Sequence, residues 1–266
     1  MSLQLERGVV GYWCPMLATT GLRLYDRSGR GNHGTLLNMD AASDWVTAKV
    51  RNTTGRVLDF DGSNDYVLTS TPPSGVFPLG SSARTMACWF RGPNAGIGGQ
   101  QIMAYGGNAG AGQRFAIFHN TTTSIGCEIS GMRSFIPITR SNNFRLLVMT
   151  MDGSSSNINS VKIYLDGVEG SEYTISGSST IDTRNTGMTF GTISGAPNNN
   201  NFVGQIAEGV IWRRFMTPSE IRTLYRIGPG WFGKQDSRVF GYSEQFATGF
   251  KGYLSRRQSH LIGGGL

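Results

Sequence analysis

The sequence predicts an all-β fold, an antiparallel β-sandwich in which many short strands are joined by tight turns. Apolar and polar residues alternate in short segments along most of the chain, which is the pattern of strands with one buried face. Turn signals such as Asp61-Gly62 and Asp166-Gly167 separate these segments. Glycine, which readily adopts the positive φ angles of hairpin turns, contributes 38 of the 266 residues, about twice its usual share.

Each strand is predicted from its own alternation. In VKIYLDG, the side chains of Val161, Ile163 and Leu165 face one way and the intervening side chains face the other. The segment TMACWFR has one face made of Met86, Cys88 and Phe90. Further strands are expected in RFAIF, SIGCEIS, FRLLVMTM, GMTFGTI and GVIWRR.

One helix is predicted directly after residue 217. Thr217 and Glu220 form a capping box, in which each side chain bonds the backbone N–H of the other residue, and Pro218 suits the first helical position. Gly228 marks the end of the helix. The apolar stripe expected to pack on the edge of the sandwich consists of Ile221, Leu224 and Tyr225.

The balance of charge favours an acidic partner. The net charge is +7, which suits anionic glycans, nucleic acid or an acidic protein surface. The basic residues are scattered, however, and no stripe interleaves them with aromatic residues, which argues against nucleic acid. The N-terminal residues lack a secretory signal and no long apolar run exists, so we expect synthesis in a cytoplasm and no membrane span. Cys14, Cys88 and Cys127 are odd in number and are expected to be buried free thiols.

Two parts of the chain differ in character. Residues 1–227 carry the strand pattern and are expected to form the sandwich, whereas residues 228–266 show no convincing periodicity. The second part is rich in aromatic residues and is predicted to be an arm that binds a partner. The residues assigned to this contact are Trp231, Phe232, Phe240, Tyr242, Phe246, Phe250, Tyr253, Arg256 and Arg257.

Five segments taken together resemble the laminin-G-like, concanavalin-A-like lectin/glucanase superfamily. They are GVVGYW, YDRSGRGNHGTL at 25–36, VLDFDGSNDYV at 57–67, VKIYLDGVEG at 161–170 and the closing segment FVGQIAEGVIWRRFMTPSEIRTLY at 202–225. The resemblance implies a jelly roll of two curved sheets that binds carbohydrate or protein, often beside a calcium ion. The glycine-rich tail resembles the ends that follow such domains in bacteriophage and marine bacterial proteins.

A calcium site is a candidate at Asp26, Asn32 and Asp61. The first two lie in the loop that the superfamily uses near its ion, and calcium prefers carboxylate and amide oxygens. The closing strand departs from the family, since Ala207 stands where a carboxylate is often found. We therefore favour the alternative, in which the two aspartates stabilise Asx turns and no cofactor is bound.

The sequence gives no sign of catalysis. None of the seven glutamates is followed by aspartate two residues later, so the paired carboxylates of the glucanases are missing. His33 is interpreted as a turn residue that bonds the backbone. Trp45 lies between predicted strands and is the candidate for stacking on a sugar. The tryptophans expected in the core are Trp13, Trp89 and Trp212.

Two classes of non-enzymatic function follow. The first is a bacteriophage virion surface component, a capsid decoration or other exterior protein, made in the host cytoplasm. It would dock through its arm on viral structural proteins or on copies of itself, and host lysis would bring it to external glycans without an export signal. The second is a bacterial carbohydrate-binding, lectin-like module.

Overall fold

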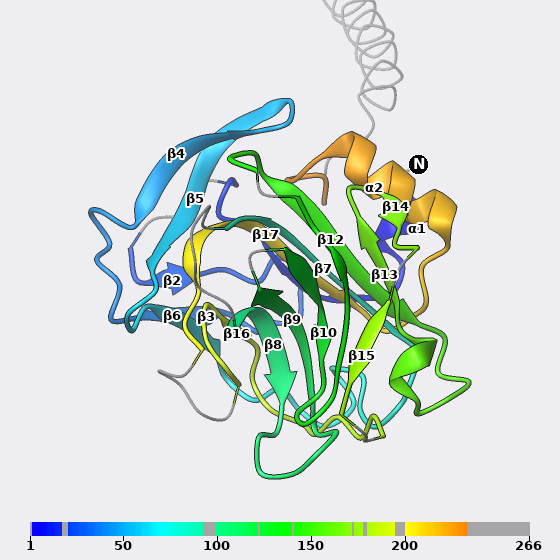
Figure 1. The fold of residues 1–266 in the computed structure, drawn as a ribbon. Helices are drawn as coiled ribbons and strands as arrows, with labels where there is room; N and C mark the ends of the chain where they lie inside the picture. The colour runs from blue at the N-terminus through cyan, green and yellow to red at the C-terminus, as the bar shows by residue number, and fades with distance from the viewer. Residues whose placement is uncertain are drawn as a thin grey trace, which may run out of the picture. The chain divides into compact units, whose positions relative to one another are not determined.

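Two antiparallel sheets pack face to face, as the alternation of apolar and polar residues predicted (Figure 1). The computed structural model describes residues 2–17, 21–92, 99–121, 123–139, 141–171, 173–177, 180–194 and 200–232. Within these residues, Leu3–Phe232 form one compact unit. The helices of this part of the chain are α1 (Ser2–Glu6), the 3₁₀ helix η1 (Ile158–Ser160) and α2 (Pro218–Ile227).

Sheet A has eight strands among the described residues, and β1 pairs with the distal half of β17. In spatial order its other strands are β14 (Val168–Glu169), β13 (Lys162–Leu165), β12 (Arg145–Met151), β7 (Arg84–Arg91), β17 (Val203–Trp212), β5 (Thr53–Asp61) and β4 (Trp45–Val50), and β1 spans Val9–Trp13. The first and last strands of the sandwich are therefore neighbours.

Sheet B has nine strands among the described residues. In spatial order they are β15 (Thr174–Ser176), β11 (Arg133–Pro137), β10 (Ser124–Glu128), β9 (Arg114–Thr121), β8 (Gln100–Gly106), β16 (Thr189–Phe190), β6 (Tyr66–Thr69), β3 (Gly34–Leu37) and β2 (Arg23–Leu24).

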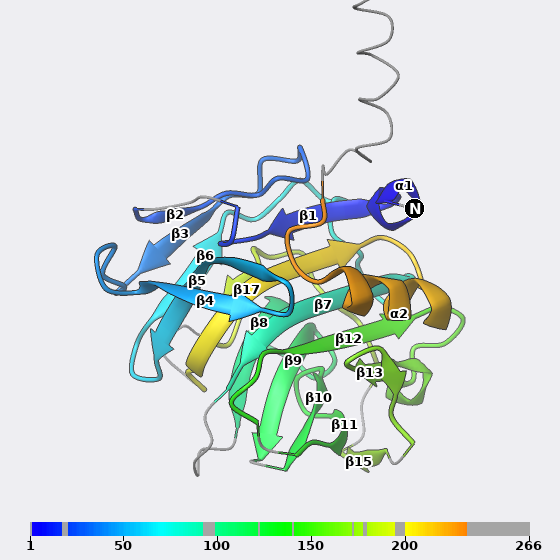
Figure 2. The same ribbon diagram turned by 90° about the horizontal axis from the view of Figure 1, so that it is seen from above.

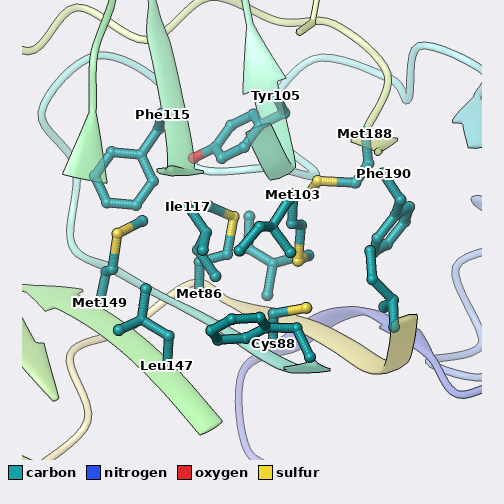
Figure 3. Close-up of a cluster of buried hydrophobic side chains, with 14 of the residues drawn as sticks. Met86, Cys88, Met103, Tyr105, Phe115, Ile117, Leu147, Met149, Met188 and Phe190 are labelled. Atoms are coloured by element: carbon teal, nitrogen blue, oxygen red, sulfur yellow. The ribbon is translucent and has the colours of Figure 1, made fainter. Parts of the chain in front are cut away.

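The main hydrophobic core lies between the two sheets. Met86 and Cys88 of β7 and Leu147 of β12 meet Met103 and Ile117 of sheet B (Figure 3). The predicted inward face of β7 is thus confirmed. All three cysteines are buried and free, as expected, and Trp13, Trp89 and Trp212 are fully buried.

A second apolar cluster covers the opposite, outer face of sheet A. Strand β7 contributes Ala87 and Trp89 to this cluster, so both faces of the strand are buried. Leu5 of α1 and Ile221 of α2 pack over the sheet here, and Figure 2 shows the two helices at the same side of it. Alternation alone did not predict this second layer, because an apolar run such as TMACWFR fits a strand buried on either one face or both.

Helix α2 has the termini that its sequence predicts. The Thr217 side chain accepts a hydrogen bond from the Glu220 N–H at 3.3 Å, and the Glu220 carboxylate accepts one from the Thr217 N–H at 2.8 Å. At the other end, Gly228 has a φ angle of 79° and donates its N–H to the Leu224 carbonyl. Arg214 pairs with Glu220 at 2.9 Å and connects the helix to the end of β17.

The compact unit ends at Phe232, five residues beyond the boundary predicted at residue 227. Trp231, which we assigned to the arm, is 2% exposed and packs in the second cluster with Phe232 against it. The other arm residues, Phe240, Tyr242, Phe246, Phe250, Tyr253, Arg256 and Arg257, lie outside the described residues. None of the described helices is long and apolar enough to cross a membrane.

Candidate functional site

A cavity of about 460 Å³ at one end of sheet A gathers three cations and no carboxylate among the residues that line it. It lies where the β4–β5 hairpin, the end of β7, the loop before β12 and the last turn of α2 meet. We call it the basic cavity, and its lining residues are Lys49, Arg51, Arg91, Asn142, Asn143, Phe144 and Tyr225.

The two arginines of the basic cavity are stacked on aromatic rings. The guanidinium carbon of Arg51 lies 4.2 Å from the centre of the Tyr225 ring, and Tyr225 in turn stacks on Trp89 with an interplanar angle of 15°. The guanidinium carbon of Arg91 lies 5.0 Å from the centre of the Phe144 ring. A guanidinium that rests on an aromatic face keeps its N–H edge available for oxyanions.

The cations of the basic cavity have no carboxylate partner in the described part of the chain. The ion pairs found there involve other arginines and Lys162. Lys49 and Arg51 are exposed, and Arg91 is half-buried. Three uncompensated positive charges around one hollow create a positive potential that attracts anions.

A second cavity of about 300 Å³ adjoins the basic cavity and shares Arg91 and Asn142 with it. Here Arg91 donates a hydrogen bond to the Gln205 side chain of β17. Gly204 is required at this point, because a Cβ would lie 2.3 Å from the Arg91 carbonyl oxygen. Asp59 of β5 also lines this second cavity. The lining is therefore cationic near α2 and carries charges of both signs near β5.

Sequence reasoning did not find the basic cavity. Arg51, Arg91 and Tyr225 come from three distant parts of the chain and form no local motif. The net positive charge was the one feature of the sequence that indicated a site for an acidic ligand. Tyr225 was expected on the apolar stripe of the helix, and it does stack on Trp89, but its other face holds Arg51.

The predicted calcium residues do not converge on one site. Asp26 and Asn32 lie together and are buried, but the Asp26 carboxylate already accepts hydrogen bonds from the N–H groups of Tyr12, Ser28 and Asn32 at 2.9–3.0 Å. Asp61 instead accepts from the Ser63 N–H at 2.7 Å. The described residues hold no group of three or more histidine, cysteine or acidic residues that could bind a metal.

The turn interpretations of these residues are confirmed. Asp26 and Asp61 each accept from the N–H two residues ahead, at Ser28 and Ser63, which is the Asx turn that we favoured. His33 Nδ1 accepts from the Asp26 N–H at 3.0 Å, so its ring closes the same loop.

Trp45 cannot serve as the sugar platform that we expected. It lies in β4, is 3% exposed and packs in the main core. Its indole N–H donates to the Gly21 carbonyl at 2.8 Å. The sequence around Trp45 resembles a loop, but the residue is the first of β4 and its side chain packs into the core between the sheets.

Glu208 is a buried carboxylate whose role the sequence did not reveal. It accepts hydrogen bonds from the Tyr12 hydroxyl at 2.7 Å, the Gly230 N–H at 2.6 Å and the Trp231 indole at 3.2 Å. Burial raises the pKa of Glu208 to about 7, although these hydrogen bonds and one from Cys14 act in the opposite direction. A β-bulge between Ile206 and Glu208 interrupts the pairing of β17 with β7 here.

This carboxylate fastens the segment after α2 to sheet A. Trp231 stacks on Trp212 with an interplanar angle of 4°, and Phe232 stacks on Tyr12 with ring centres 4.8 Å apart. Gly230 and Trp231 also supply two of the hydrogen bonds to Glu208. Residues 230–232 are therefore part of the sandwich.

A second buried carboxylate, Glu128, belongs to sheet B. It pairs with Arg114 at 2.6 Å and accepts from Gln101 at 3.0 Å and from the Ser130 N–H at 2.7 Å. Glu128 and Glu208 thus occupy different sheets, and each is engaged by its own donors. The two do not form the pair of carboxylates that glycoside hydrolysis requires.

Residues 61–222, more than half of the chain, match the family model of the Concanavalin A-like lectin/glucanases superfamily. The chain belongs to this superfamily. The resemblance seen in the sequence is therefore confirmed, together with the sandwich fold. Among curated protein sequences, none matches the chain.

Solved structures share this fold at low sequence identity. A Trypanosoma rangeli sialidase in complex with sialic acid is 16% identical with a TM-score of 0.56, over 82% of this chain and 32% of that one. The binding domain of Paraclostridial Mosquitocidal Protein 1 is 14% identical with a TM-score of 0.55, over 84% of this chain and 52% of that one.

A third structure comes from work on botulinum neurotoxin type C, described as depending for cell entry on two ganglioside molecules. It is 12% identical with a TM-score of 0.58, over 85% of this chain and 53% of that one. The chain therefore spans between a third and about half of the length of these proteins. At such identities the comparison establishes the fold.

Proposed function

We propose that the chain is a carbohydrate-binding domain without catalytic activity, and that the basic cavity holds its ligand. The observation that carries this proposal is the composition of the cavity, in which aromatic rings, two asparagine amides and three cations surround one hollow. Amides both donate and accept hydrogen bonds, as the hydroxyl groups of sugars require. The volume of about 460 Å³ falls within the usual range of ligand pockets.

The proposal of a non-enzymatic role rests on the acidic residues. Hydrolysis with retention needs two carboxyl groups roughly 5–5.5 Å apart on either side of the bond to be cut. The two buried glutamates of the described residues, Glu128 and Glu208, lie in different sheets. The residues lining the basic cavity include no carboxylate, so a sugar bound there would meet no carboxyl group as general acid or nucleophile.

A glycan array incubated with the whole chain tests the proposal. We expect retention of a defined subset of glycans, and no release of reducing ends when those glycans are incubated with the protein. Absence of retention across the array would refute carbohydrate binding. Release of reducing ends above the level of buffer alone would refute the non-enzymatic role.

We also keep the proposal that the domain is displayed on the surface of a bacteriophage virion, through the part of the chain after Phe232. This proposal is supported by the aromatic residues and paired arginines of residues 233–266, a composition typical of anchors in protein interfaces. Sedimentation separates the alternatives. The virion role predicts co-sedimentation with intact particles, whereas a free lectin-like module stays in the supernatant.

A further inference from the structure

We propose that the basic cavity selects acidic saccharides, sugars that carry an oxyanion such as a carboxylate or a sulfate. This inference rests on the proposed function and names the ligand class for the same site. The oxyanion is held by the N–H edges of Arg51 and Arg91, and a sugar hydroxyl bonds the amide of Asn143.

Both guanidinium groups of the basic cavity are held against aromatic rings. Arg51 lies on Tyr225, which is itself backed by Trp89, and Arg91 lies on Phe144 and bonds Gln205. Stacking restricts the planes of both groups. A guanidinium fixed in this way presents its donors as a preorganised fork, which fits the two oxygens of an oxyanion better than a mobile ammonium does.

The charge of the basic cavity also favours an acidic ligand. Lys49, Arg51 and Arg91 face one cavity, and none forms an ion pair within the described residues. A neutral sugar that filled the cavity would displace water from these cations without supplying a counter-charge, which is unfavourable. An acidic sugar supplies that charge, so the site discriminates against the neutral analogue.

The distribution of the cations favours a saccharide over nucleic acid. Nucleic acid binding relies on a row of cations that follows successive phosphates. Here three cations line one cavity, the other basic residues are scattered along the chain, and Asp59 lines the adjoining cavity. A cluster of cations around one cavity of about 460 Å³ suits a single charged substituent on a polyhydroxylated ring.

Calorimetry with the whole chain tests the inference, using 3′-sialyllactose, 3′-sulfolactose and lactose as probes that share one neutral core. We expect at least one acidic probe to bind roughly tenfold more tightly than lactose or better, a difference of about 1.4 kcal/mol. The gain should shrink when the salt concentration rises from about 0.05 to 0.5 M, because salt screens the cations.

Four variants locate the site. Arg51→Gln and Arg91→Gln should each lower the affinity for the acidic probe roughly tenfold and leave that for lactose nearly unchanged. Arg51→Lys keeps the charge but loses the fork, so it should restore only part of the affinity. Arg30→Gln removes an equal charge from an exposed loop outside the cavity and should change nothing. Melting temperatures near that of the wild type show that each variant is folded.

The outcomes distinguish this inference from the proposed function. Lactose bound as tightly as both acidic probes, or equal losses in the Arg30→Gln and Arg51→Gln variants, would overturn the selection of acidic sugars and leave carbohydrate binding intact. Sodium acetate or sulfate alone bound as tightly as the acidic probes would reduce the site to an anion site. A single-stranded oligonucleotide bound more tightly than any probe would assign the cavity to nucleic acid.

Discussion

Replacing Glu208 with glutamine removes the ionisable group from the second apolar cluster while keeping a side chain of nearly the same shape. The hydrogen-bond donors around this carboxylate are Tyr12 of β1, Cys14, and residues 230–231. The other titratable groups that face it are Tyr12, Cys14 and Cys88. Burial raises the pKa of all three, so they stay neutral between pH 5 and pH 8.

The sign of the effect follows from proton binding. The pKa of Glu208 is raised from 4.5 to about 7 in the folded protein, so between these values the folded state holds a proton that the unfolded state has lost. Stability therefore falls as the pH rises through this window. At about 1.4 kcal/mol per pH unit, the loss attributable to Glu208 is roughly 3 kcal/mol by the time the pH exceeds 7.

Urea unfolding of the wild type and of Glu208→Gln at a series of pH values measures this loss. Other groups also contribute, since burial and the negative charges of Asp61 and Asp44 raise the pKa of Asp65 to about 6, and burial lowers the pKa of His119. The quantity that isolates Glu208 is the difference in unfolding free energy between the two proteins. It should move by about 3 kcal/mol in favour of the variant from about pH 4.5 to pH 8.

Glu169→Gln is the matched control, because it removes a partly exposed carboxylate from β14 of the same sheet. The difference between wild type and Glu208→Gln should change with pH by more than the difference between wild type and Glu169→Gln. A profile of Glu208→Gln that stays parallel to that of the wild type would refute the reasoning, since it would mean that the Glu208 proton is held equally in the folded and unfolded states.

Three further predictions concern the edges of the fold. A chain that ends at Phe232 should be more stable than one that ends at Gly228, because Trp231 is buried. Trp231→Ala in the longer chain should lower the unfolding free energy by about 3–5 kcal/mol and the melting temperature by roughly 10 °C. Equal stability of the two chains would mean that residues 229–232 are not part of the core. Ile221→Ala should lower the unfolding free energy by about 2–5 kcal/mol, because the side chain is fully buried. Thr217→Ala should lower it by about 1 kcal/mol, because the helix loses its N-terminal cap. If both variants were as stable as the wild type, α2 would not be packed on the sandwich. Asp26→Ala should lower the unfolding free energy by about 3 kcal/mol or more, because it leaves three backbone N–H donors without an acceptor. Calcium should raise the melting temperature of the wild type by less than about 1 °C. A rise of several degrees would identify a metal site.

Local features of the fold could be predicted because their causes are local. The capping box of α2 needs only Thr217 and Glu220, and the Asx turn at Asp26 needs only a carboxylate two residues before a free N–H. The inward face of β7 followed from alternation over one strand. Each of these depends on residues close together in the sequence.

The rest depends on contacts between distant residues. Trp45 was misjudged because a tryptophan at a strand boundary can face either way, and the direction is set by the core formed after the sheets pack. Trp231 looked like a residue of the arm because its partners, Trp212 and Glu208, are recognisable only in space. The basic cavity was missed for the same reason.

The burial of sheet A on both faces determines where this domain can change during evolution. A substitution in the middle of β7 disturbs the main core at Met86 and Cys88 or the second cluster at Ala87 and Trp89, so no strand position there is free to vary. The hairpin after β4, the loop before β12 and the last turn of α2 have no such double constraint. A change of preferred ligand can therefore arise by substitutions at these three places while the sandwich itself stays as it is.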